Sequence, residues 1–133
     1  MNAGTIAAQG RPWVLADTNA WIDFIRDRHP HLRELIRASR VIGHSAIVGE
    51  LTLGCGERSA KLAEFVLTLP TIDELKFGDV REFAIQAKLA CCGIGWCDSC
   101  LLADCASMNG AIQLLTGDQT LRAAARRLGV SYD

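Results

Sequence analysis

The chain has 133 residues, of which half are apolar and 22% are charged, so it can form one domain of ordinary size with a true core. This composition excludes wholesale disorder, and a net charge of −1 gives no global signal for binding to nucleic acid or membrane. No apolar run approaches the roughly 18 residues of a membrane-spanning helix. The first residues also lack the positive start of a secretory signal, so we expect a cytoplasmic protein.

Residues 1–12 are small and polar and are expected to form a loose lead-in to a single domain over residues 13–133. In chain order we first expect a strand at 13–16 and a helix from 19 that Pro30 interrupts and that resumes around 32–36. A strand at 41–43, a helix from Ser45 to about 53, a helix around 62–69 and a strand at 71–73 should follow. The last elements expected are helices at 80–91 and 98–108, a strand at 111–115, a helix around 121–128, and an edge strand at 130–132.

Short apolar strands thus alternate with helices along the whole domain. This pattern predicts an α/β fold with a mostly parallel central sheet. Ser45 is expected to cap the helix that follows it, and Cys91 is expected on the inner face of the 80–91 helix.

Four isolated carboxylates stand in or beside apolar stretches of this pattern. Asp17 and Asp118 each follow a predicted strand, and in a parallel sheet the carboxyl ends of the strands lie at one edge, where sites form. Glu50 falls at the border of an apolar helical stripe, and Asp98 opens a helix, where backbone N–H groups favour its ionised form.

Each carboxylate alone has an ordinary explanation. Asp17 can be a turn residue at a strand end, Asp98 and Asp118 can be helix caps, and Glu50 can pair with an arginine. A carboxylate near a core is costly unless it is compensated, however, and four such positions in one small domain suggest shared compensation. The sequence therefore predicts a divalent cation bound by all four.

The segments around these carboxylates resemble the motifs of PIN-domain ribonucleases. The four segments are Val14–Asp23, Val48–Leu51 followed by Gly54, Gly95–Ala103, and Leu115–Leu121 with Ala124, Ala125 and Leu128–Val130. Their order, their spacing and the compact length are most similar to VapC-type toxins of bacterial toxin–antitoxin pairs. The resemblance runs from about residue 13 to the end of the chain.

The resemblance implies a three-layer α/β/α PIN fold and an endoribonuclease that depends on Mg²⁺ or Mn²⁺. It implies that Thr116, and Thr18 or Asn19, support the acidic cluster through hydrogen bonds. It also implies a homodimer, and inhibition by a small antitoxin whose C-terminal segment fills the active-site groove. The acidic cluster itself would consist of Asp17, Glu50, Asp98 and Asp118.

On this hypothesis Asp17 and Asp98 bind the metal, while Glu50 and Asp118 act directly or through water, with one ion or two. One carboxylate would orient or deprotonate the attacking water. The chain departs from related toxins at Gly117, which is often larger in them, and at Cys100, where they often carry histidine.

RNA would require local positive charge, because the whole chain has none in excess. Most of the arginines that could supply it are expected to lie on solvated helix faces. Trp21 and Trp96 could stack on bases, although a place in the core is expected, and the three histidines show no ligand spacing. The candidate arginines are Arg26, Arg28, Arg33, Arg37, Arg40, Arg122, Arg126 and Arg127.

Two alternative functions remain at this stage. One is a PIN-domain nuclease that processes RNA without being a toxin. The other is a thiol or zinc regulatory protein, because Cys97 and Cys100 form a C-x-x-C at a helix start, where a thiol pKa is lowered. We expect the six cysteines to be reduced core thiols: Cys55, Cys91, Cys92, Cys97, Cys100 and Cys105.

Overall fold

The computed structural model describes residues 11–133, so the predicted lead-in lies outside the described residues except for its last two positions. Within this part, strands β1 (Trp13–Ala16), β2 (Val41–Ile42) and β3 (Ile112–Leu115) form a parallel sheet in the order β2-β1-β3. The central β1 pairs with both neighbours, and its four residues are buried. The expected parallel sheet is therefore confirmed.

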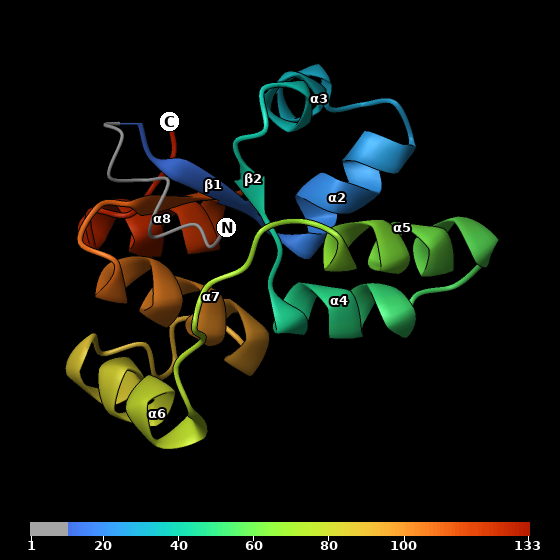
Figure 1. Ribbon diagram of the computed structural model, residues 1–133. Helices are drawn as coiled ribbons and strands as arrows, with labels where there is room; N and C mark the ends of the chain where they lie inside the picture. Colours follow the sequence, from blue (N-terminus) through green and yellow to red (C-terminus); the bar gives the residue numbers. More distant parts are fainter. Residues whose placement is uncertain (1–10) are drawn as a thin grey trace.

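Helices cover both faces of the strands in a three-layer α/β/α arrangement. In Figure 1, α2, α4 and α5 lie on one side of the strands, whereas α7 and α8 lie on the other and α6 packs beyond α7. None of the helices in residues 11–133 is long and apolar enough to cross a membrane. The helices are α2 (Thr18–Ile25), α3 (Pro30–Arg37), α4 (Ser45–Thr52), α5 (Glu57–Leu67), α6 (Phe77–Gln86), α7 (Trp96–Ser107) and α8 (Gln119–Arg127).

Parallel pairing brings the carboxyl ends of β1 and β3 together. Ala16 is in register with Leu115, and the Asp17 N–H continues the ladder by donating to the Leu115 carbonyl at 3.1 Å. Asp17 and Thr116, the next residues of the two strands, therefore leave the sheet side by side.

Two predicted strands are wrong. Residues 71–73 form no strand. The segment between α5 and α6 is a loop that side chains hold in place: Asp104 accepts the Leu75 N–H at 2.8 Å. The C-terminal tail makes a single parallel bridge, between Leu114 and Ser131, instead of an edge strand.

Three predicted helix ends also need correction. Helix α4 is capped by His44, whose Nδ1 accepts the Ala46 N–H at 3.0 Å, and not by Ser45. Helix α6 stops at Gln86, because Lys88 and Cys91 adopt positive φ angles of 57° and 60°, and Cys91 is exposed instead of buried. Helix α7 starts at Trp96, which is before Asp98.

Candidate acidic metal site

Asp17 is the most buried of the four predicted carboxylates, with 4% of its surface exposed. One oxygen, Oδ1, caps α2 by accepting the Ala20 N–H at 2.9 Å, and the other, Oδ2, accepts the Thr116 hydroxyl at 2.5 Å. Burial raises the pKa of Asp17 despite these two hydrogen bonds, and the charges of Asp118 and Asp23 raise it further. In residues 11–133 no lysine or arginine forms an ion pair with Asp17 that would offset this shift.

Thr116 joins Asp17 to Asp118. Its hydroxyl donates to Asp17 and also accepts the Asp118 N–H at 3.0 Å, while the Arg122 guanidinium holds its carbonyl with two bonds of 2.7 and 3.2 Å. Asp118 is exposed and caps α8 by accepting the Leu121 N–H at 3.0 Å. The cap explanation is thus correct for Asp118, and the same residue stands next to the buried Asp17.

Glu50 reaches the cluster from α4. The sequence places it at the border of a buried stripe, but the structure exposes it, because only Ile47 and Leu51 of α4 are buried. Because Glu50 is exposed, its charge does not need a partner to offset the cost of burial. What connects Glu50 to the site is Thr18, whose hydroxyl donates to Oε1 at 2.5 Å across from α2.

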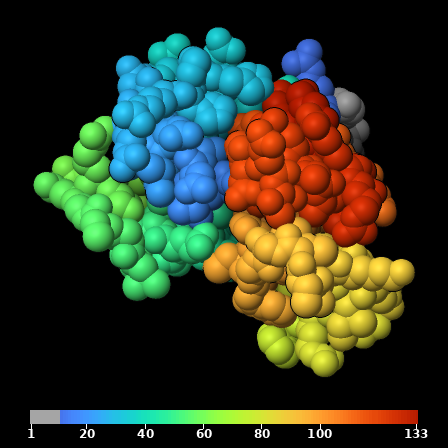
Figure 2. Space-filling view, turned by 180° about the vertical axis from the view of Figure 1, so that it is seen from behind, coloured from blue at the N-terminus to red at the C-terminus, as the bar shows by residue number. Residues whose placement is uncertain are grey.

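Asp98 lies in the first turn of α7 and is half-buried. Its pKa is raised to about 6, first by burial and then by the charges of Asp17, Glu50 and Asp118. The charges of Asp17, Glu50 and Asp118 therefore act on Asp98 from the surrounding elements. Figure 2 shows the face where α2 in blue, the start of α7 in gold and orange, and α8 in red come together.

The donor set of this cluster fits a divalent cation. In residues 11–133 no lysine or arginine forms an ion pair with any of the four carboxylates, so their mutual repulsion is not compensated by the protein. Carboxylate oxygens are the ligands that Mg²⁺ and Mn²⁺ prefer. By this chemistry Asp17, Glu50, Asp98 and Asp118 could hold such an ion, although in residues 11–133 only His44, Glu74 and Asp104 bring three ligand atoms within 4.8 Å of one another.

A polar hollow of about 380 Å³ lies next to Asp118. Asn19, one of the predicted supporting residues, lines the hollow and is exposed, whereas Thr18 makes the bond to Glu50. Asp23 borders the hollow and acts on Asp17 through its charge, yet the sequence analysis missed it. The lining residues are Asn19, Ala20, Ile22, Asp23, Arg26, His29, Gly117 and Asp118.

The cysteines of α7 differ from the expected low-pKa thiols. Burial raises the pKa of Cys97, and Glu50 and Asp98 raise it further, the former by charge and by a side-chain hydrogen bond. Burial likewise raises the pKa of Cys100 to about 11. Burial, and after it the acidic neighbours, outweigh the effect of the helix N-terminus on these pKa values. All six cysteines are free, and only Cys105 is fully buried as expected, whereas Cys55, Cys91 and Cys92 are exposed.

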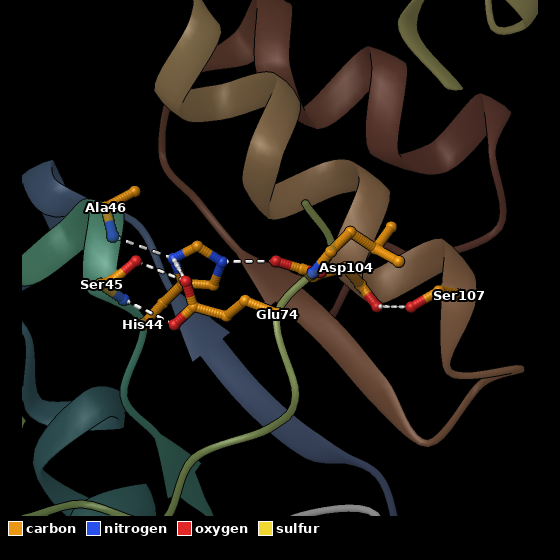
Figure 3. Close-up of polar contacts among 7 residues, drawn as sticks. His44, Ser45, Ala46, Glu74, Asp104 and Ser107 are labelled. Carbon is orange, nitrogen blue, oxygen red and sulfur yellow. Dashed lines mark hydrogen bonds and ion pairs between the residues drawn. The ribbon is translucent and has the colours of Figure 1, made fainter. Parts of the chain in front are cut away.

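His44, Glu74 and Asp104 form a second polar cluster between the start of α4, the loop before α6 and α7 (Figure 3). His44 Nε2 and Asp104 Oδ2 are 2.6 Å apart, and both side chains are buried. The sequence analysis missed Asp104, although the signal was present as an acid between the buried Ala103 and Cys105.

Comparison with known proteins identifies the class. A sequence model described as PIN domain matches residues 14–127, which is most of the chain, and the chain therefore belongs to the PIN domain family. The particular relatives are the "Ribonuclease VapC32" proteins of two Mycobacterium tuberculosis strains, CDC 1551 / Oshkosh and ATCC 25618 / H37Rv. Each is 28% identical over 118 residues, which cover 89% of this chain and 94% of the relative. The resemblance seen in the motifs is confirmed.

The raised pKa of Asp98 predicts how stability depends on pH in the metal-free protein. The folded pKa of about 6 exceeds the unfolded value of 3.8, so the folded state binds the proton more tightly. The contribution of Asp98 to the free energy of unfolding is therefore fully present below about pH 4 and is lost as the pH rises through about 6. Urea unfolding in a chelator should show this fall, and Asp98→Asn should flatten it.

Asp79→Asn is the matched control for that measurement, because Asp79 occupies the same position in α6 as Asp98 does in α7. It should leave the pH dependence unchanged. An unaltered slope in Asp98→Asn would contradict the proposed coupling of the carboxylates.

Proposed function

We propose that this protein is a metal-dependent endoribonuclease that hydrolyses RNA phosphodiester bonds at the cluster of Asp17, Glu50, Asp98 and Asp118. The observation that carries the proposal is the half-buried Asp98, whose pKa is raised to about 6 by burial and by the charges of Asp17, Glu50 and Asp118. Membership of the PIN domain family and similarity to proteins named ribonuclease support it.

The chain's own residues would divide the work as follows. Asp17 and Asp98 hold the ion, and Glu50 and Asp118 complete the site directly or through water. Thr116 and Thr18 fix the carboxylates of Asp17 and Glu50 by donating hydrogen bonds. A bound Mg²⁺ or Mn²⁺ supplies positive charge against the phosphate and lowers the pKa of water.

Proton transfer would then fall to the protein. A carboxylate of the cluster accepts the proton of the attacking water, and the water oxygen forms the new bond to phosphorus as the bond to the leaving oxygen breaks. Because water attacks, the reaction does not require the ribose 2′-hydroxyl, so a preference for RNA rests on binding.

Arg26 is the best placed cation for the RNA backbone. Five of the eight candidate arginines are engaged elsewhere by side-chain hydrogen bonds, whereas Arg26 is exposed and lines the hollow beside Asp118. A phosphate next to the cleaved one would meet Arg26 there. The engaged arginines are Arg33, Arg40, Arg122, Arg126 and Arg127.

Trp96 is the aromatic residue available for a base. Trp21 is fully buried, but Trp96 is 46% exposed at the start of α7 and packs against the exposed Phe77 at 5.1 Å between ring centroids. A nucleotide stacked on Trp96 would lie at the contact between α6 and the start of α7.

Cleavage of labelled RNA tests the activity. With Mg²⁺ or Mn²⁺ the wild type should cleave, and Asp98→Asn should lower the rate at least about 100-fold, because a carboxylate essential to the chemistry is lost. Asp79→Asn should keep the wild-type rate. Cleavage that persists in a chelator, or full activity of Asp98→Asn, would refute the site.

Binding of uncleaved RNA tests the role of Arg26. In an Asp98→Asn background, Arg26→Ala should weaken binding and reduce the slope of log K against log salt by about 1, because one phosphate contact disappears. Arg37→Ala, on the exposed end of α3, is the control and should keep the slope. An unchanged slope in Arg26→Ala would remove Arg26 from the RNA path.

We also propose that the nuclease is a toxin neutralised by a small antitoxin, by analogy with the VapC relatives. Expression in bacteria should arrest growth, Asp98→Asn should not, and coexpression of the small open reading frame beside the gene should relieve the arrest. Cleavage in vitro without any growth arrest would favour the alternative, an RNA-processing nuclease. The homodimer and the cytoplasmic location stay predictions.

A further inference from the structure

We propose that the buried His44–Asp104 pair is a clasp that fixes α4 against α7 and thereby positions Glu50 relative to Asp98. His44 and Asp104 would be positioning residues, without contact to the substrate. The inference rests on the proposed function in one respect, because it concerns the metal affinity of that acidic site.

The hydrogen bonds of His44 determine its protonation. Its Nδ1 accepts the Ala46 N–H at 3.0 Å, so this nitrogen carries no proton. The Nε2 must then carry the proton of the neutral ring and donate it to Asp104 Oδ2 at 2.6 Å. One ring therefore caps α4 and binds the middle of α7 at the same time.

Two further bonds close the clasp around the loop before α6. Asp104 Oδ1 accepts the Leu75 N–H at 2.8 Å, and Glu74 Oε2 accepts the Ser45 N–H at 2.9 Å. The Ser45 hydroxyl donates to the other Glu74 oxygen. The start of α4, the 74–75 segment and α7 are thus joined at one point (Figure 3).

The arrangement favours a clasp over a second metal site. The ligand atoms of His44, Glu74 and Asp104 lie within 4.8 Å of one another, which is close enough for an ion. The only unprotonated nitrogen of His44 is already occupied by the Ala46 N–H, however, and Asp104 accepts hydrogen bonds at both oxygens. The group is complete without a cation.

The clasp and the acidic site are equally spaced on the two helices. Glu50 follows His44 by six residues and Asp98 precedes Asp104 by six, which is about 9 Å along each helix. Two cysteines of α7 agree with this spacing. The charges of Asp104 and Glu74 raise the pKa of Cys100, whereas those of Glu50 and Asp98 raise the pKa of Cys97. A shift at the clasp would therefore move Glu50 relative to Asp98.

Mn²⁺ binding, followed by the electron paramagnetic resonance of the free ion, tests the clasp. His44→Asn ends near the position of Nδ1, so it keeps the cap on α4 but cannot reach Asp104. We expect its Kd for Mn²⁺ to rise about tenfold, as for other residues that orient metal ligands. His44→Gln, whose amide can reach Asp104, should recover most of the affinity.

Two controls separate positioning from loss of stability. Leu35→Ala, in the core under α3, should unfold at lower urea concentration than wild type yet keep the wild-type Kd. All measurements are made where urea unfolding shows the variant folded, and Asp104→Asn replaces His44→Asn if the latter does not fold. In metal-free protein, either variant should also lose hydrogen-exchange protection at the Leu75 N–H.

The outcomes are distinct. Wild-type Mn²⁺ affinity in folded His44→Asn, or equal weakening in Leu35→Ala, would overturn the clasp. If the wild type itself does not bind Mn²⁺, or if Asp98→Asn binds it as tightly, the proposed function fails instead.

Discussion

Strand β1 has hydrogen-bonded neighbours on both sides and four buried residues, and the place of the acidic site follows from this double pairing. Because β1 and β3 run parallel and in register, both chains turn away from the sheet at the same level. Asp17 caps α2 there, and Asp118 caps α8 two residues beyond Thr116. Helices α4 and α7 then only need to bring one carboxylate each to that point.

The protein holds these carboxylates with neutral donors. Asp17 receives a hydroxyl and a backbone N–H, and Glu50 receives the Thr18 hydroxyl. Arg122 donates to the Thr116 carbonyl and, in residues 11–133, forms no ion pair with the cluster. Neutral donors orient a carboxylate without cancelling its charge, so the cluster keeps its attraction for a cation. The carboxylates of the cluster therefore repel one another, while the neutral donors keep their orientation defined.

The sequence predicted the parts of the fold that depend on local pattern. The apolar runs of β1 and β3 located the sheet, and strand ends located Asp17 and Asp118. The sequence could not predict contacts made between distant segments. Ser45 is an ordinary cap residue by local rules, but Glu74 binds it and His44 takes its place. Residues 71–73 have strand-like composition, yet Asp104 on α7 holds the adjacent backbone.

The three tryptophans differ in their exposure to solvent, so the intrinsic fluorescence of the protein reports on two separate regions. Trp13 and Trp21 are 4% and 0% exposed, and the edges of Phe24 and Phe65 pack against Trp21. Trp96 alone is open to solvent, where it packs against Phe77. The long-wavelength part of the intrinsic fluorescence therefore comes from one side chain at the α6–α7 contact, while the blue part comes from the core. A single emission spectrum separates a change at this contact from the loss of the fold.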